Sequence, residues 1–312
     1  MKTGVSGFAL CLGLAACGGG TPFNSVTVVN GGGNGTGGTA IPETLANNLK
    51  SFAYNPTAQT LTVTGINADD SQFTAAYRRR PGLDRAGYEA YTAQDGSLDR
   101  HVTAYVKDIN GSRATVIVTG GQFEEFFSGA GYSSASYVAP VQPGTQGEGG
   151  LVTYAGNYVG LLNIEGSGED LTSVTPGTPD DPLSVQAAEV TGKVVITGDF
   201  TDATVDGIIY QREIVDYKTD APYSVPNIAL DGTAIAEDGS FLGTASQRNT
   251  TVGEYGGIFG GVGATEVAGV VRAEQHLASP TDNLDPVIEY GAFVLAQCGQ
   301  PNEDPICNQP VR

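Results

Sequence analysis

The sequence has few of the side chains on which catalysis and nucleic-acid binding depend. Among its 312 residues are two histidines, four cysteines, and 15 lysines and arginines against 34 aspartates and glutamates, which gives a formal net charge of −19. A polyanion of this kind repels nucleic acid and anionic lipid surfaces. No Gly-x-Ser-x-Gly motif occurs, and two histidines leave few ways to build a metal cluster or to activate a nucleophile. The composition therefore indicates a non-enzymatic protein without catalytic residues, metal or cofactor.

The N-terminus has the pattern of an export signal. A single cation, Lys2, precedes an uncharged apolar stretch from Gly4 to Ala16. A stretch of about 13 residues suits a signal peptide, whereas a membrane-spanning helix needs roughly 20. The stretch ends in Leu-Ala-Ala-Cys, which resembles the bacterial lipobox, where small residues admit the lipoprotein signal peptidase and the cysteine is acylated. We therefore predict that residues 1–16 are a lipoprotein signal peptide and that Cys17 is the lipidated first residue of the mature chain.

The residues after Cys17 indicate where the protein is held. Gly18 stands where inner-membrane lipoproteins have an acidic residue, so the resemblance favours the outer membrane, on its periplasmic face or at the cell surface. Because the chain is acidic, the acyl group and not a basic patch must supply membrane attachment. Residues 18–40 are rich in Gly, Thr and Asn and carry no charge. We expect residues 17–45 to be the lipidated cysteine and a flexible tether.

The remaining cysteines predict one disulfide. Cys11 leaves with the signal peptide and Cys17 is acylated, so Cys298 and Cys307 are left as a pair, with eight residues between them. This Pro-, Gly- and Asn-containing segment can turn back on itself in an oxidising compartment. We expect the disulfide to close the C-terminal tail, residues 298–312.

Residues 46–140 predict a small β-rich domain. The segment "FAYNPTAQTLTVTGI" indicates a β-hairpin with Asn55-Pro56 at its turn, and Asn110-Gly111 separates two further β-rich runs. A short helical turn is expected within 121–129, and the basic run Arg78 to Arg80 is interpreted as a solvated loop. The Pro- and Gly-rich residues 139–150 mark the domain boundary.

Residues 150–297 predict an all-β, eight-stranded antiparallel up-and-down barrel. The segment 189–200 alternates apolar and polar residues, and tight turns such as Asp238-Gly239 indicate hairpin connections. A meander of eight strands leaves two open edges unless it closes. Charged residues predicted on the outer face argue for a soluble barrel and against a lipid-facing one; they are Glu189, Lys193, Asp199, Glu266 and Arg272. The expected strands are 151–164, 189–200, 203–212, 226–236, 240–248, 252–260, 265–274 and 286–297.

Four segments of this region carry a family resemblance. "VTYAGNYVGLLN", "GKVVITGDFTDATVDGII", "DGSFLGTA" and "YGGIFGGVGATEVAGVV" resemble the β-barrel domain of the transferrin-binding protein B family. The most specific match is a G-x-x-A-x-E-x-x-G stretch formed by Gly261, Ala264, Glu266 and Gly269. The resemblance covers about residues 150–297 and implies that residues 46–140 form the smaller "handle" that precedes such barrels. It further implies a single handle-plus-barrel lobe that is lipid-anchored and binds a partner.

Two long connections are the candidate recognition loops. Residues 166–188 contain Asp180 and Asp181, and residues 213–226 contain Tyr217 and Tyr223, whose rings could supply contact area to a partner. Other acidic pairs such as Glu169-Asp170, and His276 after the seventh strand, are interpreted as solvated groups. The leading hypothesis is a lipoprotein that binds an unknown protein or environmental ligand through its barrel loops. Two alternatives are a lipocalin-like carrier that uses the barrel interior and a structural envelope lipoprotein.

Overall fold

The computed structural model describes residues 25–30, 39–66, 71–120, 126–140, 150–179, 183–216, 222–277 and 286–308. The predicted signal peptide and Cys17 lie outside these residues, so lipidation stays a prediction. No helix in the described part of the chain is both long and apolar enough to span a membrane.

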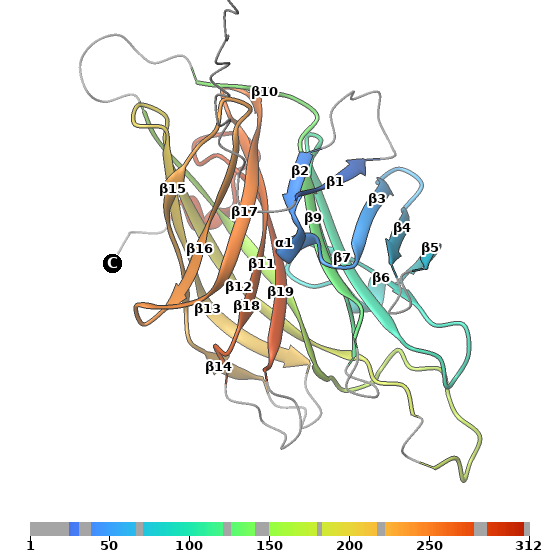
Figure 1. The fold of residues 1–312 in the computed structure, drawn as a ribbon. Coiled ribbons are helices and arrows are strands. Elements are labelled where there is room, and N and C mark those ends of the chain that lie inside the picture. Colours follow the sequence, from blue (N-terminus) through green and yellow to red (C-terminus); the bar gives the residue numbers. More distant parts are fainter. Residues whose placement is uncertain are drawn as a thin grey trace, which may run out of the picture.

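The second half of the chain forms the predicted barrel (Figure 1). Each strand is antiparallel to the next, and β19 pairs with both β18 and β11, which closes the sheet on itself. All eight expected strands are present and the fold-class prediction is confirmed. The barrel strands are β11 Leu151–Glu165, β12 Ala187–Asp199, β13 Thr204–Asp216, β15 Ile228–Ala234, β16 Ser240–Gln247, β17 Thr250–Val262, β18 Glu266–Glu274 and β19 Ile288–Ala296.

Aromatic rings fill the barrel interior and lie over glycines of the wall. Tyr158, Phe259 and Phe293 are fully buried. A Cβ added at Gly269 would come within 2.3 Å of the Phe293 Cζ atom, so that ring occupies the space that glycine leaves. The interior residues Tyr154, Tyr158, Tyr255, Phe259 and Phe293 belong to one buried cluster with the inward-facing valines and isoleucines. An interior filled in this way weighs against the small-ligand carrier.

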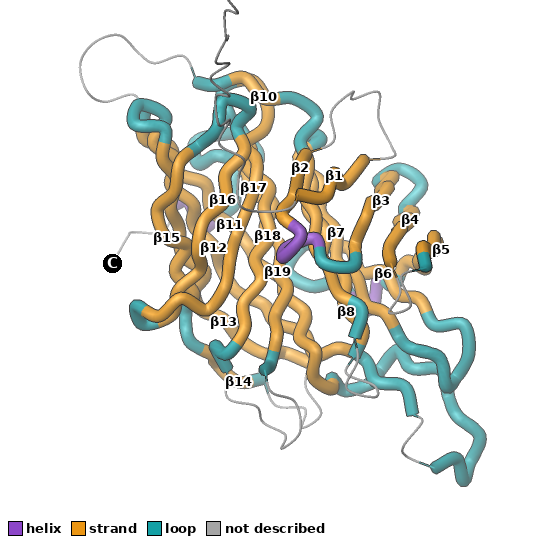
Figure 2. Tube along the Cα trace, viewed as in Figure 1, coloured by secondary structure: helices purple, strands orange, loops and turns teal. Residues whose placement is uncertain are grey.

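The first half forms a nine-stranded sheet, which we call the handle (Figure 2). Strands β3 to β9 follow one another as antiparallel neighbours and curl into a nearly closed sheet. A single helical turn, α1 (Glu43–Ala46), precedes β3. The strands are β1 Ser25–Asn30, β2 Thr39–Pro42, β3 Leu49–Asn55, β4 Thr60–Ile66, β5 Gln72–Arg79, β6 Glu89–Ala93, β7 Val102–Ile109, β8 Ser112–Thr119 and β9 Ser128–Ser133.

The expectation of an unstructured tether over residues 18–40 is wrong for two segments. Strand β1 pairs with β2 in antiparallel register and with β3 in parallel register at Val29↔Ser51. The apolar run "SVTVV" has high β propensity, and an existing sheet edge supplies the backbone partners that the Gly-rich flanks cannot provide. Structure therefore begins before the predicted handle boundary at residue 46.

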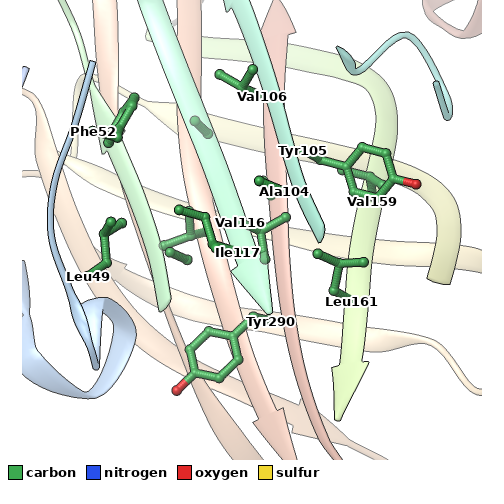
Figure 3. Packing of buried hydrophobic residues seen from close by; sticks show 14 of the residues in the cluster. Leu49, Phe52, Ala104, Tyr105, Val106, Val116, Ile117, Val159, Leu161 and Tyr290 are labelled. Carbon is green, nitrogen blue, oxygen red and sulfur yellow. The ribbon is translucent and has the colours of Figure 1, made fainter. Parts of the chain in front are cut away.

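The handle covers one outer face of the barrel. Val159 and Leu161 of β11 and Tyr290 of β19 pack against Ala104, Val116 and Ile117 of the handle (Figure 3). The same contact buries two carboxylates predicted to face water, since Glu189 and Glu266 are 0% and 3% exposed. Glu189 pairs with Arg85 Nε at 2.7 Å, and Glu266 accepts a hydrogen bond from Asn110 Nδ2 at 2.7 Å. Two of the charged residues on the outer face of the barrel, Glu189 and Glu266, therefore contact the handle and do not face water.

The basic run Arg78 to Arg80 is not a solvated loop. Arg78 and Arg79 are the last residues of β5 and pair with β6. The guanidinium of Arg79 donates from both Nη atoms to the Asp84 carboxylate, at 2.5 and 2.7 Å. The helical turn expected within 121–129 falls partly on 121–125, outside the described residues; Ser128 and Gly129 begin β9.

The C-terminal segment is closed by the predicted Cys298–Cys307 disulfide and lies against the barrel. It includes the short helix Pro305–Asn308, whose Ile306 is buried. A two-residue strand, β10 (Tyr137–Val138), pairs in parallel with the end of β17 as the chain leaves the handle. Both ends of the barrel sequence are therefore held against folded structure.

We predict that Gly269→Ala destabilises the protein by about 1–3 kcal/mol, because its methyl group would overlap the Phe293 ring and the Gly256 carbonyl oxygen. The control is Gly232→Ala in β15, where an added Cβ meets nothing within 4 Å. Urea unfolding followed by circular dichroism measures both variants. Equal stabilities for the two variants would contradict the packing described here.

Candidate functional site

The connections at the two ends of the barrel differ in length. Residues 166–186, 217–227 and 275–287 join strands at one end, which we call the loop end (Figure 1). Short turns at residues 200–203, 235–239 and 263–265 join strands at the opposite end. Variable-length loops on a rigid barrel are the usual place for binding residues. The loop end is therefore the candidate functional site.

The first loop is fixed to the handle through Asp170. One carboxylate oxygen lies 2.8 Å from Arg80 Nε, and the other lies 3.0 Å from His101 Nε2. The Thr92 hydroxyl also donates to Asp170, at 2.7 Å. The interpretation of the Glu169-Asp170 pair as solvated is therefore wrong for Asp170, while Glu169 is exposed.

The electrostatics of this contact favour a carboxylate beside a neutral imidazole. Burial would raise the pKa of Asp170, but hydrogen bonds from His101 and Thr92 and the charge of Arg80 hold it below its ordinary value. Burial lowers the pKa of His101, and Asp170 only partly opposes this shift. The contact is thus at full strength near neutral pH and is lost as the pH falls through the depressed pKa of Asp170.

Both arms of the first loop make further contacts with the handle. The Thr172 amide donates to Gln94 Oε1 at 2.8 Å, and the His101 amide donates to Ser184 Oγ at 3.1 Å. Between them, residues 173–177 are exposed. Beside Asp170 lies a pocket of about 130 Å³. It is lined by Ala76, Arg78, Arg80, Thr92, Ala93, Gln94, Asp95, Asp170 and Thr172.

The second loop meets the base of the first at Asp216. This buried carboxylate accepts hydrogen bonds from the Ser167 amide at 2.9 Å and from Gln186 Nε2 at 3.4 Å. Tyr223 lies in a short strand, β14 (Tyr223–Val225), which folds back on β13 opposite Ile214. Tyr217, Asp180 and Asp181 lie outside the described residues. The two candidate loops therefore contact each other near the strands from which they start. The predicted binding roles of Tyr217, Asp180 and Asp181 stay predictions.

Beneath the loop end, a charged cluster closes the barrel interior. Arg212 Nη2 pairs with Glu289 Oε2, and the Tyr158 hydroxyl donates to Glu289 Oε1 at 2.6 Å. Burial would raise the pKa of Glu289, but the charge of Arg212, helped by His276, holds it well below its ordinary value. Arg212 also donates from Nη1 to the Pro226 carbonyl oxygen. The cluster ties the second loop to the barrel wall.

His276 was expected to be solvated, and that expectation is wrong. Its side chain is 0% exposed, and its Nε2 lies 2.9 Å from Glu289 Oε2. A position just after β18 looks like a surface loop in the sequence, but the loop folds into the barrel mouth, where Glu289 supplies a partner. Within the described residues, His276 Nδ1 and Arg212 Nε have no hydrogen-bond partner.

The remaining candidate catalytic and metal-binding groups of the described residues take part in contacts within the protein. His101 is paired with Asp170 through Nε2, and its buried Nδ1 has no partner in the described part of the chain. One set of potential metal ligands exists there, made of Cys298, Glu303 and Cys307. Both sulfurs belong to the disulfide, and Glu303 accepts hydrogen bonds from the Gly299 amide and from Asn308 Nδ2.

Comparison with known proteins finds similar solved structures but no family. No protein-family model matches the chain, and no curated protein matches it. Among solved structures, a mutant of transferrin-binding protein B from Haemophilus parasuis Hp5 matches with TM-score 0.36 and 12% identity over 78% of this chain and 52% of that one. Transferrin-binding protein B from serogroup B Neisseria meningitidis matches with TM-score 0.29 and 11% identity, over 78% and 51%. An intact transferrin-binding protein B with N and C lobes gives TM-score 0.35, 11% identity, 78% and 53%.

The chain therefore spans about half the length of these solved proteins and is distantly similar to them in structure. The motif that suggested the resemblance has a physical basis in the β17–β18 connection. Gly261 has a φ of +77° and Ala264 a φ of 52°, both in the left-handed region that a tight turn requires. Glu266 meets the handle, and Gly269 leaves space for Phe293.

Sequence reasoning missed most of the polar residues that build the site. Arg80, His101 and Asp170 come from three separate segments, and Arg212 and Glu289 from two distant strands. The sequence signal that could have identified Arg212 and Glu289 is a charged residue at an inward-facing position of a strand. Arg212 and Glu289 both stand on the inward-facing register of apolar strands, where a charge demands a buried partner.

We predict that Asp170→Asn releases the first loop from the handle. Loss of the charge that holds Arg80 and His101 should cost about 1–3 kcal/mol and increase backbone hydrogen exchange over residues 166–172. Glu169→Gln is the matched control, because the exposed side chain of Glu169 makes no hydrogen bond or ion pair with the described residues. Indistinguishable exchange in the two variants would show that Asp170 does not fix the loop.

Proposed function

We propose that the protein is a non-enzymatic envelope lipoprotein, anchored at the outer membrane by an acyl group on Cys17, whose loop end binds a protein or an environment-derived ligand. The observation that carries this proposal is the asymmetry of the barrel, with three long connections gathered at one end and short turns at the other. The loop end also meets the handle at Asp170, so a partner would contact a surface built from both domains.

The packing of the barrel supports surface recognition over internal carriage. Tyr158, Phe259 and Phe293 fill the interior, and the Arg212–Glu289 pair closes it beneath the loops. Residues 173–177 of the first loop are exposed while both of its arms are held by hydrogen bonds to the handle. A loop with fixed arms loses less conformational entropy on binding than a free one.

Site-specific shielding tests the proposed binding end. The mature chain without Cys17 has only the paired Cys298 and Cys307, so a new cysteine can be labelled selectively with a bulky polyethylene glycol maleimide. Thr175→Cys places the label on the first loop, and Glu237→Cys places it on an exposed turn at the opposite end. Proteins captured from the culture medium and from the cell envelope are then compared across the labelled and unlabelled domains.

We expect at least one partner to be retained by the unlabelled and Glu237-labelled domains and lost from the Thr175-labelled domain. Retention by all three would place binding elsewhere on the molecule. Failure to recover any partner would favour the structural envelope lipoprotein.

The anchor is tested separately. In the native host, the wild-type protein should incorporate radiolabelled palmitate and sediment with membranes, and Cys17→Ser should abolish both properties, because the thiol is the acylated group. Cys11→Ser is the matched control, since that cysteine leaves with the signal peptide. Palmitate on the Cys17→Ser protein would contradict the assignment. Protease treatment of intact cells then separates the cell surface from the periplasmic face.

A further inference from the structure

A cleft lies between the handle and the outer wall of the barrel. Its volume of about 700 Å³ falls within the range of roughly 300–1,000 Å³ that is usual for ligand sites. The floor is the outer face of β11, β12, β13 and β14, and Ala86 of the handle forms one side. The lining residues are Ala86, Asn157, Thr191, Gly192, Lys193, Gln211, Glu213 and Ser224.

The strand registers set the spacing of the polar side chains on this floor. Thr191, Glu213 and Ser224 are direct cross-strand neighbours on β12, β13 and β14. Directly opposite residues project to the same face, with Cβ atoms about 4.5–5.5 Å apart. Asn157 and Lys193 form another such pair on β11 and β12, and Lys193 Nζ donates to Asn157 Oδ1 at 2.5 Å. The barrel therefore holds these polar groups at fixed positions.

The side of the cleft is a tight turn of the handle that is held at both ends. Ala86 is a central residue of this turn, in which the backbones of Arg85 and Tyr88 hydrogen-bond to each other at 2.7 and 3.3 Å. Arg85 Nε lies 2.7 Å from Glu189 of the barrel, and the Tyr88 hydroxyl donates to the Asn157 carbonyl oxygen at 3.2 Å. Ala86 cannot move away from the floor unless one of these contacts breaks.

Two residues of the lining have a strained backbone. Ala86 has a φ of 52° and Gln211 a φ of 48°, in the left-handed region that costs energy for a residue with a Cβ atom. Gln211 lies in a β-bulge, where the three-residue step from Glu213 to Tyr210 matches a two-residue step in β12. Bulges and strained residues are concentrated at ligand sites, because there they direct side chains towards a ligand. The positions of Ala86 and Gln211 in one cleft support a binding role for it.

The polar side chains of the lining are available to a ligand. Among the described residues, the side chains of Thr191, Gln211, Glu213 and Ser224 form no hydrogen bond or ion pair. The hydroxyls and the amide can donate and accept hydrogen bonds, the carboxylate accepts them, and the Lys193 ammonium donates them. Lys193 and Glu213 are the charged residues of the lining, so its formal charges cancel. A matching ligand therefore carries closely spaced donors and acceptors and no net charge.

These requirements favour a neutral oligosaccharide over a peptide. Each sugar hydroxyl both donates and accepts hydrogen bonds. Peptides are usually recognised by a sheet edge, an apolar groove, an aromatic-lined groove or an arginine cluster. This floor is a sheet face, and its lining contains neither an aromatic side chain nor an arginine. The net charge of −19 disfavours acidic glycans. Four adjacent strands extend over about 14 Å, which exceeds the width of a single sugar ring.

We propose that the cleft between the Ala86 turn and the floor of β11 to β14 binds a neutral oligosaccharide. Glu213 accepts hydrogen bonds from its hydroxyls, Lys193 donates to them, and Thr191 lies between these two groups on the floor. This site goes beyond the proposed function, which concerns a partner at the loop end. Neither Thr175 nor any other residue of the first loop is part of the cleft lining.

Lysine acetylation tests the proposal without changing the lining. The mature chain carrying Cys17→Ser is treated with acetic anhydride alone or with a neutral hexasaccharide of glucose, mannose, galactose or N-acetylglucosamine, each at about 10 mM so that millimolar affinities are detected. Mass spectrometry then measures acetylation of Lys193 and of Lys50, a half-buried lysine of β3 that serves as the control. We expect at least one hexasaccharide to lower acetylation of Lys193 about threefold by occupying the site and to leave Lys50 unchanged.

A pair of variants supplies a second measurement. Glu213→Ala should weaken binding of the protecting hexasaccharide about tenfold, because it removes a charged hydrogen-bond acceptor. Asp206→Ala is the matched control, since this exposed carboxylate lies on the same strand about 23 Å away. Circular dichroism confirms that both variants are folded.

Three results would overturn the proposal. They are no protection of Lys193 by any neutral hexasaccharide, equal protection by an acidic hexasaccharide of galacturonate, and equal affinities of the Glu213→Ala and Asp206→Ala variants. These measurements use sugars and the cleft, whereas the shielding experiment follows captured proteins and the loop end. Failure of one is therefore distinct from failure of the other.

Discussion

The structure depends on burial of the apolar outer face that β11, β18 and β19 present to the handle. A closed barrel satisfies its own backbone hydrogen bonds, but this face carries Val159, Val270 and Tyr290, which would otherwise meet water. Covering them with the handle removes a large apolar area from solvent, the dominant favourable term in folding. The same contact takes Glu189 out of water, where burial raises its pKa to about 7 despite the nearby Arg85. The polar contacts at the loop end follow from this docking.

The barrel was predictable from the sequence because its determinants are local. Period-two alternation in β12 and turn residues such as Asp238-Gly239 define strands and hairpins one at a time, and closure then follows from the need to satisfy two edges. The sequence also predicted that some glycines of the barrel wall leave space for aromatic rings. The particular pairings were not, because Gly269 and Phe293 lie on neighbouring strands whose register the sequence alone does not state.

The polar site was largely unpredictable because its contacts are nonlocal. Nothing near His276 indicates that Glu289 will bury it, and nothing near Asp170 indicates Arg80 or His101. The prediction of a flexible tether was wrong for a different reason. Composition treats residues 18–40 as one flexible segment, whereas the short apolar run in β1 gains partners from β2 and β3 that only the folded handle supplies.

If Cys17 is acylated as proposed, the position of β1 also sets how far the folded part of the protein lies from the membrane. Strand β1 begins at Ser25, so only residues 18–24 lie between it and Cys17. Fully extended, seven residues span at most about 25 Å. For a chain acylated at Cys17, the handle rather than the barrel would therefore be the part held close to the lipid headgroups. The length of the extended segment 18–24 is comparable to the thickness of half a bilayer with its headgroup layer.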